Sequence, residues 1–501
     1  MQVQYQFPKF TAAEAISFAY ENYNLSVTAH PLPSERDQNF HLKTDSGQEY
    51  VLKIANATEQ RELLDLQNQA LEHLAARAPN LTLSRVCSAN SGQTIIPITS
   101  PTGETHLMRL LTYVPGQLWA QVNPHTPELL HSLGQVLGTV DQALADFSHP
   151  AAQRTLKWDL PHAAWIREYL PYLPDPTRRA IVEKFLARFE TEVLPVLPNL
   201  RSSIIYNDAN DYNILVSQDD PRQRRVVGVI DFGDMTRTQT ICDLAIAAAY
   251  ALMDKPDPLT AAAHMVTGYH AAFTLTEAEL AVLFPLICIR LCITVTNAAY
   301  QRHIEPDNAY LTISERPAWN LLHKLAEIPP QLAYYTFRQA CGLPACPHTP
   351  ALVEWLTANA DRFDRVVEPD LKIANPFIFD LSVGSLELGN SADFADLGPF
   401  THKLFGRIRA ANAPTGIGKY NEARPLYTSE LFKADSNDGP EWRTVHTGLD
   451  IFMEAGSAVF APLDGVVHSF RNNVGTLDYG PTIILEHKTC EVLKPHRSPH
   501  Q

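Results

Sequence analysis

The sequence predicts an α+β fold in which a small β-rich lobe precedes a mainly helical lobe and an incomplete β domain follows both. Alternating residues and one helical stretch fill residues 1–114, and helical periodicity dominates 115–345. A second β-like pattern occupies 421–488. A chain of 501 residues is too long for one ordinary core, which favours two or three domains.

Composition narrows the classes of partner. The chain is 45% hydrophobic and 19% charged, which is typical of globular proteins, and its net charge of -15 argues against a nucleic-acid or membrane-surface partner. Seven cysteines lack zinc-type pairing and indicate reduced thiols. The N-terminus has no secretory pattern, so a cytoplasmic location is expected. The apolar run 281–299 is interrupted by Pro285 and Arg290, which favours a buried helix.

The first lobe reads as strands around one central helix. A helix is expected over 11–24, and Phe40 to Ile54 reads as a hairpin around a polar turn. A helix over 59–76 and strands over 93–98 and 106–113 follow. Val114-Pro115-Gly116 breaks the pattern and reads as a hinge.

The second lobe is predicted to be helical around one β-hairpin. The hairpin combines the β-rich runs 204–216 and 226–232, which a polar loop separates. Helical spacing covers the ranges 127–146, 161–171, 176–193, 258–273, 276–301 and 315–326.

Beyond residue 345 the composition changes. Residues 346–420 are predicted to form a helix, 350–363, and a linker rich in polar residues and glycine. A β-like pattern over 444–486 predicts the β domain, and 489–501 is expected to be a disordered tail.

The hairpin carries the most informative side chains. Asp208 and Asn213 are five residues apart across a short loop, and Asp231 ends an apolar strand just before Phe232 and Gly233. Phosphoryl transfer needs a carboxylate to take the acceptor proton and oxygen ligands for Mg²⁺. Each segment alone could be a surface turn, but their order and spacing favour one magnesium site.

These runs resemble the H-G-D-x-x-x-x-N and I-D-F motifs of the aminoglycoside-phosphotransferase/choline-kinase family, and IDFGDM followed by CDLAIA resembles its hydroxylysine-kinase-type branch. The resemblance covers about residues 1–340 and implies a bilobal protein-kinase-like fold. It also implies a kinase using ATP or GTP on a small hydroxylated amine, with Asp208 as base and Asn213 and Asp231 as Mg²⁺ ligands. Tyr206 and Asn207 replace the His and Gly of the family motif.

The N-lobe is expected to supply the nucleotide contacts. Lys53 in Val-Leu-Lys-Ile resembles the phosphate-binding lysine of kinases. Its helical partner stays open, since Gln67 occupies the position where the family often has Glu, and Glu62 and Asp65 lie nearby. Further predicted nucleotide contacts are Ser34 or Asn39 from a glycine-free loop over the phosphates, and backbone near Leu111 and Tyr113 against the nucleobase.

Substrate contacts are weaker hypotheses. Trp158 and Asp159 resemble a run of the hydroxylysine-kinase branch. Arg290, inside an apolar helix, is a candidate for a substrate carboxylate, with a buried structural ion pair as the alternative. Asp243 is expected to cap or brace the helix that follows it.

The C-terminal segment shows a different pattern. His446 and Asp450 have a spacing that can converge on Zn²⁺, and the region resembles the first half of a lysostaphin-type metallopeptidase. That family needs a third ligand, and His496 and His500 lie in a tail without strand character. The missing ligand argues against Zn²⁺ in this chain and makes the site vestigial or incomplete.

This domain order also resembles bacterial fusions with a class III aminotransferase, which suggests a fused or separate pyridoxal-phosphate-dependent aminotransferase as partner and a chain that is the front part of a longer protein. Two other functions compete with a kinase. One is a zinc metallopeptidase, and the other is a non-catalytic module that only binds nucleotide, for which the departures at Tyr206 and Gln67 are the motive.

Overall fold

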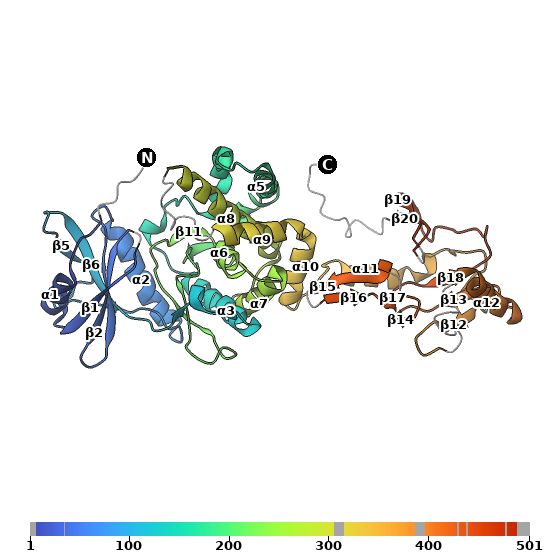
Figure 1. Ribbon diagram of the computed structural model, residues 1–501, viewed down its shortest axis with the longest axis horizontal. Helices are drawn as coiled ribbons and strands as arrows, with labels where there is room; N and C mark the ends of the chain where they lie inside the picture. Colours follow the sequence, from blue (N-terminus) through green and yellow to red (C-terminus); the bar gives the residue numbers. More distant parts are fainter. Residues whose placement is uncertain are drawn as a thin grey trace. The chain divides into compact units, whose positions relative to one another are not determined.

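The computed structural model describes residues 7–34, 36–304, 315–385, 396–427, 430–436, 439–475 and 478–487. Contacts within the chain separate it into two compact units, Met1–Cys346 and Pro347–Gln501. Figure 1 shows strands β1, β2, β5 and β6 of the first unit gathered near the N-terminus, followed by a larger group of helices in which β11 lies. The predicted α+β fold, with a β-rich lobe before a mainly helical one, is confirmed.

The N-lobe is a six-stranded sheet with the order β1-β2-β3-β6-β4, and β5 also pairs with β6. Its strands are β1 (Val27–Leu32), β2 (Gln38–Thr44), β3 (Glu49–Ile54), β4 (Val86–Cys87), β5 (Ile96–Thr99) and β6 (Thr105–Thr112). Two helices belong to this lobe, α1 (Ala12–Tyr23) and α2 (Arg61–Arg77). Strand β1 was not predicted, because Pro31 interrupts its pattern; proline is tolerated there since β1 is an edge strand.

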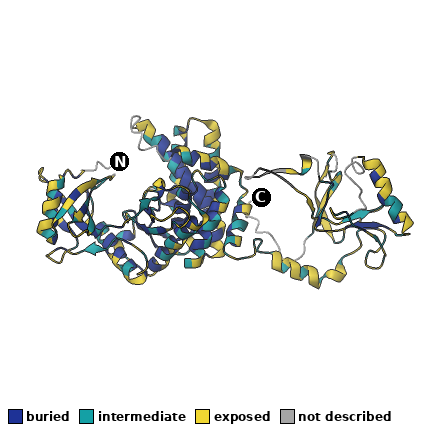
Figure 2. Cartoon of the chain, turned by 60° about the horizontal axis from the view of Figure 1, so that its bottom comes forward, coloured by how far each residue is buried: buried dark blue, intermediate teal, exposed yellow. Residues whose placement is uncertain are grey.

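The C-lobe is built on long apolar helices. They are α3 (Pro127–Leu144), α5 (Pro176–Arg188), α6 (Ile241–Ala251), α7 (Pro258–Ala272), α8 (Glu277–Ile304), α9 (Glu315–Glu327) and α10 (Pro330–Ala340). Among the described residues, α8 is the one helix long and apolar enough to cross a membrane, but 83% of its most apolar window is buried inside the protein. Figure 2 shows this concentration of buried residues in the helical lobe. Helix α8 is therefore accounted for as a core helix.

Two predictions for the C-lobe are corrected. The stretch 161–171 is not one helix but a 3-10 turn, the single helical turn α4 (Ile166–Tyr169) and a second 3-10 turn, because Pro161 and Pro171 interrupt it. The stretch 204–216 is not one strand. Strand β8 (Ser202–Ile205) pairs with β11 (Thr236–Gln239), whereas β9 (Ile214–Val216) pairs with β10 (Val226–Val229) and β7 (Gln117–Leu118).

The second unit has its own small core, around Phe379, Leu404 and Ile408. The segment predicted as linker supplies helix α12 (Leu397–Ala410) and strands β12 (Phe377–Phe379) and β13 (Gly416–Gly418), after α11 (Thr349–Ala358). Strand β13 pairs with β12 and with β18 (Asp450–Phe452), and β14 (Glu422–Ala423) pairs with β17 (Val445–His446). Two further pairs are β15 (Lys433–Ser436) with β16 (Gly439–Trp442) and β19 (Gly465–Asn472) with β20 (Pro481–His487). The predicted tail lies outside the described residues.

Candidate active site

Three polar residues stand in a row across the N-lobe sheet. Asn39 of β2 lies directly opposite Lys53 of β3, and Lys53 lies opposite Arg109 of β6. Residues opposite one another on neighbouring strands point to the same face, so the strand register gathers these side chains. The Asn39 side-chain oxygen is buried without a hydrogen-bond partner. The prediction that Asn39 and Lys53 belong to one site therefore has a geometric basis in the sheet.

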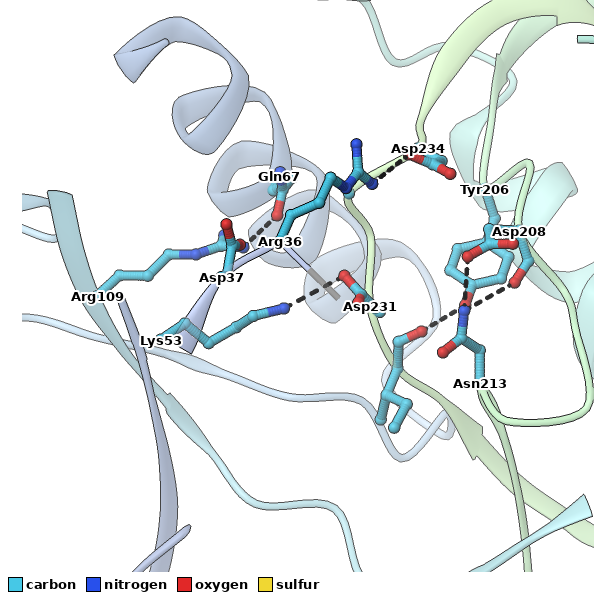
Figure 3. Close-up of polar contacts among 12 residues, drawn as sticks. Arg36, Asp37, Lys53, Gln67, Arg109, Tyr206, Asp208, Asn213, Asp231 and Asp234 are labelled. Atoms are coloured by element: carbon cyan, nitrogen blue, oxygen red, sulfur yellow. Dashed lines mark hydrogen bonds and ion pairs between the residues drawn. The ribbon is translucent and has the colours of Figure 1, made fainter. Parts of the chain in front are cut away.

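The partner of Lys53 lies in the other lobe. Its Nζ is 3.2 Å from Oδ1 of Asp231, as Figure 3 shows. Gln67 of α2 instead accepts from Arg109, which also donates to the Asn68 side chain at 2.9 Å. Burial lowers the pKa of Arg109 to about 10. Lys53 and Arg109, the two positively charged residues of this row, thus have separate partners.

The loop after β8 explains the two departures from the family motif. The Tyr206 side chain is fully buried, and its hydroxyl donates to the Ile230 carbonyl. Asn207 has φ 68°, a left-handed conformation that glycine adopts freely and that asparagine tolerates better than most residues. Its backbone N–H donates to Asp243 Oδ1 at 2.7 Å. Asp243 therefore braces this loop, and tyrosine and asparagine fit the loop geometry.

Asp208 and Asn213 meet across the loop. The Asn213 side-chain amide donates to Asp208 Oδ2 at 2.7 Å and to the Asp208 carbonyl at 3.1 Å. A second amide, from Asn210, donates to Asp208 Oδ1 at 2.9 Å. Burial raises the pKa of Asp208 to about 8, and the neighbouring charge of Asp234 adds to this effect. The carboxylate is thus held in one orientation and has a high proton affinity.

The turn 231–234 brings two more carboxylates to the same place. Asp231 has φ 62°, and the charge of Lys53 is the main cause that lowers its pKa. Asp234 accepts from Arg36 of the β1–β2 loop at 3.3 Å. Figure 3 shows Arg36 and Lys53 extending toward these two aspartates. Arg36 and Asp234 were not predicted as site residues, because the direction of a loop side chain has no signature in the sequence.

The residues present fit a divalent cation. Asn213 uses its amide nitrogen on Asp208, which leaves Oδ1 as a cation ligand, and Asp231 adds an ionised carboxylate. No cluster of three His, Cys, Asp or Glu side chains suited to a metal occurs in the described parts of the chain. One carboxylate and one amide oxygen are ligands of the kind that Mg²⁺ takes from proteins, where it is commonly held by one or two carboxylates and by substrate phosphates.

Three other residues were predicted to contact the nucleotide, and their positions favour such a contact less than those of Asn39 and Lys53 do. Ser34 is exposed in the β1–β2 loop. Leu111 pairs with Val51 and Val86 inside the sheet, and the Tyr113 backbone N–H donates to the Glu49 carbonyl at 3.0 Å. That N–H is therefore occupied, so the predicted nucleobase contact at Tyr113 would need its carbonyl.

The three predicted substrate residues, Trp158, Asp159 and Arg290, differ in their burial and in their partners. Trp158 packs against the C-lobe core, and Asp159 is 2% exposed, with His162 at 3.1 Å from its carboxylate. Arg290 is 6% exposed and donates to the Tyr250 hydroxyl at 2.9 Å, while its Nε is buried without a partner. Among the described residues, no carboxylate lies within ion-pair distance of Arg290, so the alternative of a structural ion pair is not observed there.

In the second unit, His446 and Asp450 do converge, with Nε2 3.2 Å from Oδ1. Asp450 also accepts from Arg424 at 2.6 Å, and Tyr427 meets the other ring nitrogen of His446 at 2.6 Å. The guanidinium of Arg424 already compensates the carboxylate, which disfavours a cation there. His496 and His500 lie outside the described residues.

Comparison with known proteins gives consistent matches to the first unit. The model of the phosphotransferase enzyme family matches residues 28–280. Hydroxylysine kinase of Mus musculus is 32% identical over 343 residues, which cover 64% of this chain and 90% of the mouse protein. The Danio rerio hydroxylysine kinase is 29% identical over 332 residues, or 64% and 93% of the two chains.

Solved structures that match this chain are more distant in sequence. An amicoumacin kinase in complex with AMP-PNP, Ca²⁺ and its ligand shares 14% identity over 64% of this chain and 96% of its own, with a TM-score of 0.49. A microcompartment-associated aminopropanol kinase shares 16% identity over 67% and 100%, with a TM-score of 0.44. The family assignment rests on the family model and the hydroxylysine kinases, which indicate phosphoryl transfer to a hydroxyl acceptor. This chain belongs to the phosphotransferase enzyme family.

Proposed function

We propose that this protein transfers the γ-phosphate of ATP or GTP to the hydroxyl of a small amine, either a hydroxy amino acid similar to hydroxylysine or an amino alcohol. The observation that carries this proposal is the meeting of Lys53 with Asp231, next to the Asp208–Asn213 pair. The relationship to hydroxylysine kinases supports the acceptor class.

In the proposed reaction, Asp208 orients the acceptor hydroxyl and takes its proton. The acceptor oxygen forms a bond to the γ-phosphorus, the bond from that phosphorus to the β-phosphate oxygen breaks, and the nucleoside diphosphate leaves. Lys53 binds the phosphates of the nucleotide. Mg²⁺, which Asn213 and Asp231 would hold, supplies charge neutralisation for the phosphates.

The test is a screen of hydroxylysine, homoserine, ethanolamine, choline and aminoglycosides with ATP and with GTP. Asp208→Asn keeps an oxygen that can accept from Asn213, so the variant is expected to fold, to bind nucleotide and to lose turnover. Asp211→Asn is the matched control, since Asp211 lies in the same loop and none of the side-chain hydrogen bonds described above involves it. Equal turnover of Asp208→Asn and wild type would remove Asp208 from the mechanism.

Arg290 favours an acceptor that carries a carboxylate. Its guanidinium is buried and has a neutral hydroxyl as partner. Its charge opposes part of the rise in the pKa of Asp208, so it lies within electrostatic reach of the proposed base. A hydrogen bond between charged groups contributes about 1.5–3 kcal/mol, or roughly tenfold or more in affinity. Arg290→Gln should therefore raise KM for hydroxylysine at least about tenfold and leave KM for ethanolamine unchanged. An equal change for both acceptors would remove the carboxylate contact.

The competing functions have less support. A non-catalytic nucleotide-binding module rested on the departures at Tyr206 and Gln67, and both side chains make contacts that suit an intact site. The D208N comparison separates this function from a kinase. A metallopeptidase rests on His446 and Asp450 alone, and tight, stoichiometric zinc in the purified protein would be needed to revive it. An aminotransferase that acts on the same amines remains a proposed partner.

A further inference from the structure

Arg36 lies beside the proposed transfer site, at a different residue of the turn 231–234 from Lys53. Both residues come from the N-lobe and both reach the four-residue turn 231–234 of the C-lobe. Lys53 contacts the first residue of this turn, Asp231, and Arg36 contacts the last, Asp234. The charge of Asp234 helps to raise the pKa of Asp208, so Arg36 contacts a carboxylate that lies within electrostatic reach of the proposed base.

Asp234 does not depend on Arg36 for charge compensation. Arg154 donates to the carbonyls of Gly233 and Met235, which fixes a second guanidinium at the same turn, and the charges of Arg154 and Asp234 act on each other. If Arg36 moved to another anion, Arg154 would still be close to the Asp234 carboxylate. The Arg36 side chain is 35% exposed, so water can solvate its guanidinium during an exchange of partner, while Asp234, which is 11% exposed, keeps the charge of Arg154 nearby.

The loop that carries Arg36 is anchored by its neighbour. Asp37 accepts from the backbone N–H and the side-chain amide of Asn56 at 3.1 and 3.3 Å. Asn56 is 3% exposed and accepts in turn from Thr58. The backbone next to Arg36 is thus fixed by contacts that do not involve Arg36, and its long side chain can change partner while the loop stays in place.

We propose that Arg36 exchanges Asp234 for the γ-phosphoryl group when the nucleoside triphosphate binds, and that it is a catalytic residue that stabilises the charge of this group during transfer. This inference rests on the proposed function. The bonds formed and broken and the proton transfer to Asp208 are those of the reaction above. A planar guanidinium suits this role because it donates two parallel hydrogen bonds to phosphate oxygens.

The experiment compares Arg36→Ala with Lys43→Ala. Lys43 is at the other end of β2 and forms a similar exposed ion pair, with Glu49 at 2.9 Å. With the best acceptor of the screen, Arg36→Ala should lower kcat about 100-fold or more. Its affinity for ADP should stay unchanged, whereas its affinity for AMP-PNP, which has the γ-position, should fall. Added guanidinium ions should restore part of the rate, and sodium chloride at equal ionic strength should not. Lys43→Ala should match wild type in each measurement.

Three results would overturn the proposal. They are a wild-type kcat for Arg36→Ala, an equal loss of ADP and AMP-PNP affinity, or a reduced rate that guanidinium does not restore, since the latter two would place the effect in the loop. If Arg36→Ala does not fold, Arg36→Gln keeps a hydrogen bond to Asp234 and must meet the same criteria. Turnover that survives in Asp208→Asn would instead contradict the proposed function, so the two failures are distinguishable.

Discussion

Replacing Gly134 by alanine should destabilise the C-lobe more than most single substitutions. Helices α3 and α7 approach so closely that a Cβ at Gly134 would lie 1.9 Å from the Met265 carbonyl oxygen. In the reverse direction, a Cβ at Gly268 would lie 2.0 Å from the His131 carbonyl oxygen. Both obstacles are backbone atoms, which cannot rotate away as a flexible side chain can.

The magnitude follows from the displacement required. Real Cβ atoms stay at least 3.0 Å from such neighbours, so the two helices must separate by about 1.1 Å at Gly134. Overpacking of this kind costs about 1–3 kcal/mol, occasionally more, and backbone contact belongs at the upper end. Alanine recovers about 1 kcal/mol of helix propensity relative to glycine. We expect a net loss of roughly 2 kcal/mol or more in the free energy of unfolding.

The same displacement should reach the active site. Asp141, two turns along α3, accepts from the Tyr269 hydroxyl of α7 at 2.6 Å. The charges of Asp141 and Asp243 act on each other, and Asp243 holds the Asn207 backbone. Separation of α3 from α7 loosens this buried set, so turnover should fall together with stability.

Urea unfolding measures the stability change, with two glycines for comparison. Gly138→Ala would place Cβ 2.7 Å from the Tyr269 carbonyl and should cost less. Gly406 of α12 has nothing within 4 Å, so its alanine variant should equal or exceed wild type in stability. If Gly134→Ala were as stable as wild type, or less damaging than Gly138→Ala, the close helix contact would be refuted.

The other predictions concern buried polar groups of the same unit. Gln67→Leu removes an acceptor from the buried guanidinium of Arg109 and should cost about 1–3 kcal/mol, seen as a lower thermal midpoint with ADP absent. Burial raises the pKa of Asp243 to about 6 in the folded chain, from 3.8. Its contribution to stability is therefore full below the unfolded value and is lost as pH rises through about 6. Asp243→Asn should consequently gain stability relative to wild type between pH 4 and 7, and a difference between the two that does not vary with pH would contradict this. Lys53→Met should weaken ADP binding at least tenfold in a calorimetric titration, and unchanged affinity would place Lys53 outside the nucleotide site.

Local patterns predicted the elements that follow local rules. The spacing of Asp208 and Asn213 is set within one loop, and Lys53 is placed by the β2–β3 hairpin, so both were accessible from the sequence. Strand β1 escaped because its edge position tolerates Pro31, and α12 escaped because Gly398, Pro399 and Gly406 obscure its helical pattern. The pairing of β8 with β11 depends on contacts across more than 30 residues, which no local pattern contains.

The partner of Lys53 shows most clearly why sequence reasoning stopped short of the site. The sequence left Gln67, Glu62 and Asp65 as candidates, because the usual arrangement places a carboxylate on the helix. Here that helix position holds the neutral residue Gln67, which accepts a hydrogen bond from Arg109, while Lys53 contacts the proposed metal ligand Asp231.

This arrangement has a consequence for nucleotide binding. In the proposed reaction, a cation held by Asp231 and phosphates held by Lys53 would both enter where these two side chains touch, so binding would exchange one ion pair for two new ones. In the same way, the γ-phosphoryl group would replace Asp234 as the partner of Arg36. These two ion pairs would then open together, while the contacts of α2 with Asp146 and His149 would keep the lobes joined on the other side.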